Sequence, residues 1–378
     1  MRAWAELLRV SALFTVPGDA LAGAATLGTR PNRGTALAVG ASLCLYEAGM
    51  ALNDWADREE DAVDRPHRPI PSGRITPTAA LTAAGALTAA GLALASRAGR
   101  PALAVATALS AAVWSYDLHF KHTPCGPAAM ATARGLDLVL GAVATGTPPR
   151  RESLGRGTSG EPRRAAGARG PAFTALPSAA LLAAHTYAVT TVSRREAQGG
   201  STLAPLAALA ATIGLGALAS RPPRGGGLRA VPEASAPAPR SVLAGQRGLP
   251  PLSFPPRAAG GLPPTRRSRI SAQPGRGGGG ESIQRSAGPP ALRAALTPGR
   301  LAAAALAAAY IRTAAKPLLH AALNPSPPLT QRAVGGGIRA MIPLQAALAA
   351  RAGAGATALA VMGLVPLARK LARKVSPT

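Results

Sequence analysis

The chain has 378 residues and a formal net charge of +26. Hydrophobic residues make up 47% of it and charged residues only 15%. Soluble domains carry about 25% charged residues, so the composition argues against a water-soluble globular protein. The two cysteines, Cys44 and Cys125, are too few for a disulfide-linked scaffold.

Long Ala/Leu-rich segments predict an all-α, polytopic membrane bundle, because a spanning helix needs about 20 mostly apolar residues. Pro343 and Gly353 interrupt the last apolar stretch, which is therefore either one kinked helix or two short ones. We expect about nine transmembrane helices, with eight or ten as alternatives. The candidate segments are 8–28, 34–53, 77–97, 101–118, 125–146, 176–193, 202–220, 300–319, 333–349 and 353–368.

Basic residues in the connecting loops predict the orientation. Arginines follow the second apolar segment, Lys121 follows the fourth, and the C-terminal tail is basic. Under the positive-inside rule, this pattern predicts a multi-pass protein of the cell membrane whose motif-bearing loops face the cytoplasm. A basic tail on the same side favours an even number of spans.

Two basic segments divide the chain. Residues 221–300 contain 13 Arg, 15 Pro and 14 Gly without hydrophobic periodicity, which predicts disorder. Two interpretations stay open for this segment: a flexible basic loop, or GC-rich coding DNA read out of frame. Nucleic acid is not an expected partner, because the segment lacks interleaved aromatic residues. The expected organisation is an N-terminal transmembrane half (1–147), a disordered basic loop (148–175), further transmembrane helices (176–220), the Pro/Gly/Arg-rich insert (221–299) and C-terminal transmembrane helices (300–378).

The strongest chemical signal is the acidic run from Asn53 to Asp64, directly after the second apolar segment. If the helix continues, Asp54, Asp57, Asp61 and Asp64 form one stripe. Carboxylates so placed repel one another unless a cation lies between them, and oxygen ligands combined with phosphates favour Mg²⁺. A solvated acidic helix end is the alternative.

Arginines follow the acidic run at Arg65, Arg68 and Arg74. Arginine binds phosphate in a bidentate manner. The intervening prolines prevent the helix from continuing. Carboxylates, a metal ion and arginines together predict a diphosphate site, with a basic cytoplasmic anchor as the alternative for the arginines.

These motifs resemble a known family. The pattern Asn53-Asp54-x-x-Asp57-x-x-x-Asp61 followed by Arg68-Pro69-Ile70-Pro71-Ser72-Gly73 is similar to the first signature of the UbiA family of intramembrane prenyltransferases. Tyr116 to Lys121 resembles that family's Tyr-x-x-x-x-Lys loop, and Arg134 to Gly141 resembles its fifth helix. The resemblance covers most of 1–220 and resumes at about 300–378, and the EboC-like subgroup is the nearest.

The resemblance implies a helical fold around a central lipid-accessible cavity. It implies Mg²⁺-dependent transfer of a prenyl group from an allylic isoprenoid diphosphate to an unidentified acceptor, in contact with membrane lipid. The implied Mg²⁺ ligands are Asn53, Asp54, Asp57 and Asp61. The implied catalytic residues are Asp54, Asp57, Asp61 and Lys121, and the implied substrate-binding residues are Asn53, Arg65, Arg68, Tyr116, Arg134, Asp137, Arg194 and Glu196.

The chain departs from the family at the second aspartate-rich motif, which follows the sixth helix. Ser193 stands where the first aspartate is expected, Arg194 follows it, and only Glu196 is acidic. Either an arginine replaces a second metal ion, or the chain is a catalytically degenerate relative that binds or moves a lipid-like molecule. Asp137 lies within the fifth apolar segment, where we expect it to face the cavity, with an ion pair to Arg134 as the alternative.

Overall fold

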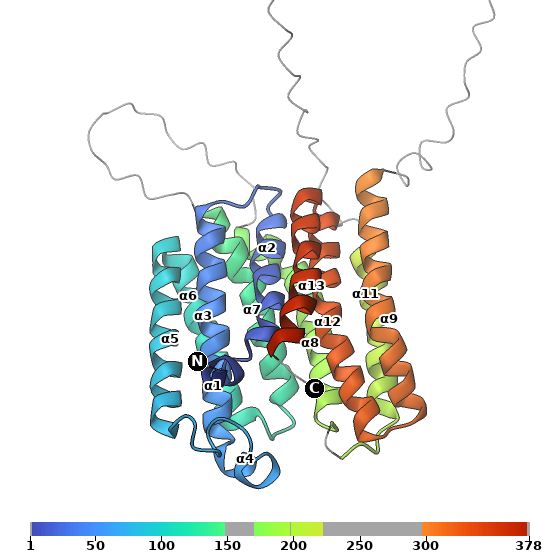
Figure 1. Cartoon of the computed structure of the whole chain (residues 1–378). Coiled ribbons are helices and arrows are strands. Elements are labelled where there is room, and N and C mark those ends of the chain that lie inside the picture. The colour runs from blue at the N-terminus through green and yellow to red at the C-terminus, as the bar shows by residue number, and fades with distance from the viewer. Residues whose placement is uncertain (1, 148–169, 197, 222–296, 376–378) are drawn as a thin grey trace, which may run out of the picture. The chain divides into compact units, whose positions relative to one another are not determined.

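A computed structural model describes residues 2–147, 170–196, 198–221 and 297–375. Most of the two basic segments, namely 148–169 and 222–296, lies outside these residues, as do the expectations made for it. The described residues form helices and turns without a strand, which confirms the all-α fold class. In chain order the elements are α1 (Arg2–Leu7), the 3-10 helix η1 (Val10–Thr15), α2 (Val16–Ala25), α3 (Arg33–Ala56), α4 (Arg58–Asp64), α5 (Pro77–Ala98), α6 (Arg100–Ser115), the π-helical turn η2 (Tyr116–Phe120), α7 (Gly126–Gly146), α8 (Pro171–Ser193), α9 (Leu203–Ser220), α11 (Pro298–Leu323), α12 (Pro327–Arg351) and α13 (Gly355–Val375) (Figure 1).

The first apolar segment is not one helix, contrary to the expectation for 8–28. It is divided into η1 and α2, and α1 ends before it at Leu7. Arg9 takes a left-handed backbone conformation with φ 47° at the start of η1. Pro17 lies in the first turn of α2, where its missing N–H costs no helical hydrogen bond. This break brings Arg9 to the end of the bundle where α4 lies.

The last apolar stretch is two helices. α12 continues through Pro343 to Arg351, and Gly353 then ends it with a φ of 84° that favours glycine. α8 begins at Pro171 rather than at 176.

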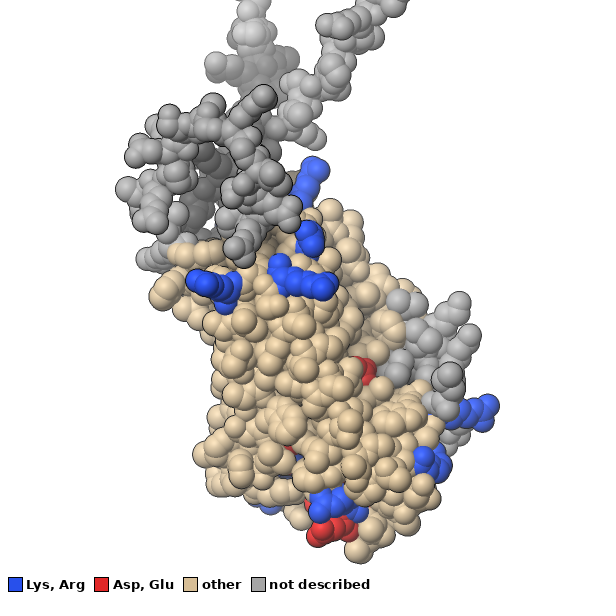
Figure 2. All heavy atoms as spheres, turned by 90° about the vertical axis from the view of Figure 1, so that its left-hand side faces the viewer, with Lys and Arg blue, Asp and Glu red and all other residues tan. Residues whose placement is uncertain are grey.

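Six of the described helices are long and apolar enough to cross a membrane: α3, α5, α7, α8, α9 and α12. α6 has only 16 residues, and α11 carries Arg312 and Lys316 among its apolar residues. The count of nine spans therefore stays a prediction. On one flank a largely uncharged band separates basic side chains at the two ends (Figure 2), which is the distribution that a membrane-embedded bundle requires.

Small residues let the helices approach closely. α2 packs on α7 where Gly23 and Gly141 lie, and a Cβ atom at either position would overlap backbone atoms of the other helix. Inside a membrane the hydrophobic effect does not drive helices together, so close packing of this kind stabilises their association. The turns that end α3, α6 and α8 lie at the same end of the bundle as α4 (Figure 1). This end carries the acidic run and the Tyr116–Lys121 loop.

Candidate functional site

The acidic run bends at Asp57. α3 ends at Ala56 and α4 begins at Arg58, with Asp57 between them at φ −87° and ψ 3°. Asp54, Asp57 and Asp61 are buried, with 4%, 8% and 1% of their surface exposed, whereas Asp64 is exposed. The expectation of one continuous stripe of four carboxylates is therefore wrong, because helical periodicity holds only as long as the helix continues.

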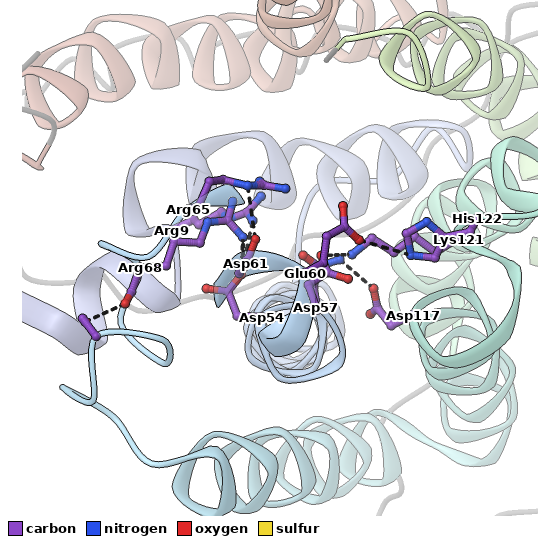
Figure 3. A network of polar contacts seen from close by, with 12 residues as sticks. Arg9, Asp54, Asp57, Glu60, Asp61, Arg65, Arg68, Asp117, Lys121 and His122 are labelled. Carbon is purple, nitrogen blue, oxygen red and sulfur yellow. Dashed lines mark hydrogen bonds and ion pairs between the residues drawn. The ribbon is translucent and has the colours of Figure 1, made fainter. Parts of the chain in front are cut away.

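Asp54 and Asp61 lie together on an arginine side of the bend (Figure 3). Arg68 donates to Asp61 Oδ2 at 2.7 Å and to Asp54 Oδ1 at 3.4 Å, so one guanidinium bridges both carboxylates. Arg65 Nε lies 3.1 Å from Asp61 Oδ1. Arg9 donates to Asp54 Oδ1 at 3.3 Å. Three arginines from two segments thus offset the charge of two buried carboxylates.

Asp57 lies on a lysine side, toward η2 (Figure 3). Lys121 Nζ forms an ion pair with Asp57, and Asn53 donates through Nδ2 to Asp117 Oδ1 at 2.9 Å. The backbone N–H of Lys121 donates to the carbonyl of Tyr116, which closes a π-helical turn. This turn directs Lys121 toward the bend. Burial raises the pKa of Asp117 to about 6 and that of Tyr116 to about 12.

A potential cation-binding group lies beside Lys121. Asp57, Glu60 and His122 each place one ligand atom within 4.8 Å of the others. His122 Nε2 is 4.0 Å from Glu60 Oε2, and both side chains are half or more exposed. Together with the buried carboxylates, this group makes the end of α3 rich in the hard oxygen donors that divalent cations such as Mg²⁺ prefer.

The segment after α8 reaches both sides of the bend. Arg194 donates to the carbonyl of Thr123 at 2.7 Å, in the turn that follows Lys121. Burial raises the pKa of the half-buried Glu196 carboxyl, and the charges of Arg65 and Arg9 oppose that rise, so Glu196 lies within electrostatic range of the arginine side. Ser193 Oγ donates to the carbonyl of Thr190 in its own helix.

Arg134 and Asp137 belong to a different network, buried between helices. Arg134 Nε pairs with Asp19 Oδ2 at 3.0 Å, and Asp137 accepts a hydrogen bond from Ser42. Gln345 donates to Asp19 Oδ1 at 2.6 Å. The ion pair of Arg134 thus joins α7 to α2. Asp137, which was the alternative partner of Arg134, is hydrogen-bonded to Ser42 of α3. A substrate-binding role for either residue stays a prediction.

Sequence reasoning missed several charged residues at this end. Arg9 reaches Asp54 across 45 positions of the chain, and only the break before η1 makes that contact possible. Its one signal in the sequence is a charge within an apolar segment. Glu60 and His122 were missed because nothing in their local sequence places them beside one another. Asp117 lies inside the Tyr–Lys loop, but its hydrogen bond to Asn53 depends on how α3 and η2 meet.

Comparison with known proteins places this geometry in a family. Residues 11–219 match the UbiA prenyltransferase family. Digeranylgeranylglyceryl phosphate synthase of Methanopyrus kandleri is 39% identical over 129 residues, which is 33% of this chain and 46% of that protein. The synthase of the same name from Halobacterium salinarum is 33% identical over 115 residues, which is 30% of this chain and 42% of that protein. The chain thus spans about half or less of the length of these curated relatives.

Solved structures of low sequence identity also resemble the fold. One of digeranylgeranylglyceryl phosphate synthase covers 93% of this chain and 97% of its own, with a TM-score of 0.49 and 13% identity. A UbiA homolog from Archaeoglobus fulgidus bound to DMAPP and Mg²⁺ covers 57% of this chain and 74% of its own, with a TM-score of 0.43 and 20% identity. The EboC-like subgroup stays a prediction. The family match spans more than half of the chain, and this chain is a multi-pass membrane protein that belongs to the UbiA prenyltransferase family.

Proposed function

We propose that this protein transfers a prenyl group from an allylic isoprenoid diphosphate to an acceptor, with Mg²⁺ as cofactor. One observation carries the proposal. Asp54, Asp57 and Asp61 are buried at one end of a helical membrane bundle, and each lies against a cation that can bind phosphate. Membership of the family supports the same reaction.

The donor set fits a magnesium ion. The carboxylates of Asp54, Asp57 and Asp61 and the amide oxygen of Asn53 would hold it, since Mg²⁺ prefers few carboxylates together with substrate phosphates. When bound, the ion would supply positive charge that stabilises the leaving diphosphate. Arg68 and Lys121 pair with these carboxylates in the structure. When the metal ion neutralises the carboxylates, both cations could bind phosphate oxygens instead.

The remaining predicted residues surround this centre. Arg65 adds a third cation near the phosphates, and Arg194 fixes the turn that follows Lys121. Glu196, in the segment after α8, lies within electrostatic range of Arg65 and Arg9. Together with Tyr116, and with Arg134 and Asp137 deeper in the bundle, these residues form the proposed substrate site. Preorganised cations of this kind stabilise charge that develops as the allylic C–O bond breaks.

The acceptor is unidentified. A glyceryl phosphate is the first class to test, because the relatives reported above are named for a product of that class. The reaction would take place on the side of the membrane that the positive-inside rule predicts to be cytoplasmic. A central lipid-accessible cavity would hold the prenyl chain and exclude water from the allylic cation.

Binding of an allylic diphosphate with and without Mg²⁺ tests the proposal. We expect Mg²⁺-dependent binding by the purified protein in detergent, and its loss in Asp54→Asn and Asp57→Asn. Asp64→Asn is the matched control, since it makes the same change on the exposed side of α4. Unchanged binding in both site variants would contradict the site. Binding without turnover in the presence of acceptor would support the catalytically degenerate alternative, with Ser193 as the residue to restore to aspartate.

A further inference from the structure

The α11–α12 hairpin carries a concentration of positive charge that the proposed reaction does not use. Residues 298–351 contain no Asp or Glu, but they contain cations on both helices. Arg312, Lys316 and His320 follow one another at four-residue intervals on α11, so they share a face. Arg332 and Arg339 are seven residues apart on α12 and also share a face.

These cations line the outer side of the contact between the two helices. Tyr310, Ala314 and Leu318 make the buried face of α11. Gly336 of α12 lies against Pro317, which brings the two helices close together at this level. Lys316 and Arg332 are exposed. They thus lie on the side of the hairpin turned away from the bundle core.

A small pocket lies between these side chains. It has a volume of about 120 Å³ and is lined by Lys316, Pro317, His320, Leu329 and Arg332. Lys316 is about 10 Å from the end of α11 at Leu323, by the helical rise. The α11–α12 turn lies beside the segment after α8, where Gly200 N–H donates to the carbonyl of Pro325, so the pocket lies near the end of the bundle that carries the α3–α4 site.

No anionic side chain compensates Lys316 or Arg332 among the described residues, since neither forms an ion pair there. Cations on a membrane-embedded helix are costly unless an anion or water meets them. Arginine and lysine together are the side chains that bind phosphate. Leu319 and Leu323 are exposed on α11 and lie within one turn of His320, which lines the pocket, so they offer apolar surface close to it. A ligand that fits this surface would have an anionic group to pair with the cations and an acyl chain to cover the apolar side chains.

We propose that the pocket between α11 and α12 binds the phosphate headgroup of an anionic membrane phospholipid, with Lys316 and Arg332 contacting the phosphate. Its acyl chain would lie along Leu319 and Leu323. The bound lipid would let α11 remain in the membrane despite its charges. The inference is independent of the proposed reaction, because none of these residues belongs to the α3–α4 site.

The test uses the whole protein purified in mild detergent and titrated with phosphatidylglycerol or with phosphatidylcholine, with bound lipid counted by native mass spectrometry. We expect the parent to bind phosphatidylglycerol and not phosphatidylcholine. The double variant K316Q/R332Q should bind phosphatidylglycerol about tenfold or more weakly, the loss expected for two charge-assisted contacts. The control R97Q/R100Q removes two exposed arginines from the opposite end and should stay within about twofold of the parent.

Equal weakening in the control would overturn the site, as would equal binding of the two lipids. Displacement of the lipid by millimolar inorganic phosphate in the same detergent would also overturn the proposal, because the pocket would then be a site for a free anion. If the double variant does not fold, R332Q alone should show the same selective loss to a smaller degree. The charge-preserving variant K316R/R332K should retain binding, and its failure to do so would contradict a phosphate contact.

Discussion

Arg68→Met should reveal how the buried carboxylates are held before substrate binds. Arg68 is 19% exposed and bridges Asp61, which is 1% exposed, and Asp54, which is 5% exposed at its side chain. Removing one partner of a buried ion pair costs about 3–5 kcal/mol, because it leaves an uncompensated charge. Arg65 stays 3.1 Å from Asp61 and still compensates part of its charge, so we expect a smaller loss of roughly 2–3 kcal/mol.

The matched control is Arg65→Met. Arg65 is 42% exposed, and its ion pair among the described residues is with Asp61, which Arg68 also holds, so its loss should cost about 1 kcal/mol or less. Thermal unfolding in detergent with a chelator measures both. Mg²⁺ should restore much of the stability that Arg68→Met loses, since the ion would offset the same carboxylates. Equal losses in the two variants, or no effect of Mg²⁺, would refute the reasoning.

Three further predictions concern the neighbouring charges. Lys121→Met leaves Asp57 unpaired and should weaken diphosphate binding about tenfold or more, measured by competition with labelled substrate. Asp117→Asn removes a carboxyl whose pKa burial raises to about 6. Because ionisation of that carboxyl destabilises the folded parent, the variant should match the parent below pH 4 and become more stable than it up to pH 6, by at most about 3 kcal/mol in chelator. No gain in stability at pH 8 would contradict this. Arg134→Met leaves the buried Asp19 without its ion pair and should cost about 3–5 kcal/mol by thermal unfolding, most of which the double variant with Asp19→Asn should recover.

The local part of the site could be predicted from the sequence. Arg68 lies seven positions after Asp61, and Pro66 between them follows the end of α4 and prevents the helix from continuing, so their contact follows from short-range geometry. The ion pair between Lys121 and Asp57 spans 64 positions. Periodicity alone offers no reason for it, and the expectation that both residues share a site depended on the resemblance to a family.

Contacts between distant helices could not be predicted in the same way. Periodicity offers Asp137 as the neighbour of Arg134, three residues along the same helix, whereas the fold brings Asp19 of α2 against it. The bend at Asp57 could not be predicted either, because the acidic run has the spacing of a continuing helix and nothing in its apolar pattern marks the break. Packing between helices decides both points.

Diphosphate release tests the central proposal most directly. The purified protein would be incubated with allylic diphosphates of several chain lengths, with and without Mg²⁺, and with a lipid extract or a glyceryl phosphate as acceptor. The account predicts release that requires Mg²⁺, acceptor and Asp57, with Asp64→Asn behaving as the parent does. Release that is unchanged in Asp57→Asn, or that proceeds equally without Mg²⁺, would contradict a prenyltransferase centre at the α3–α4 bend.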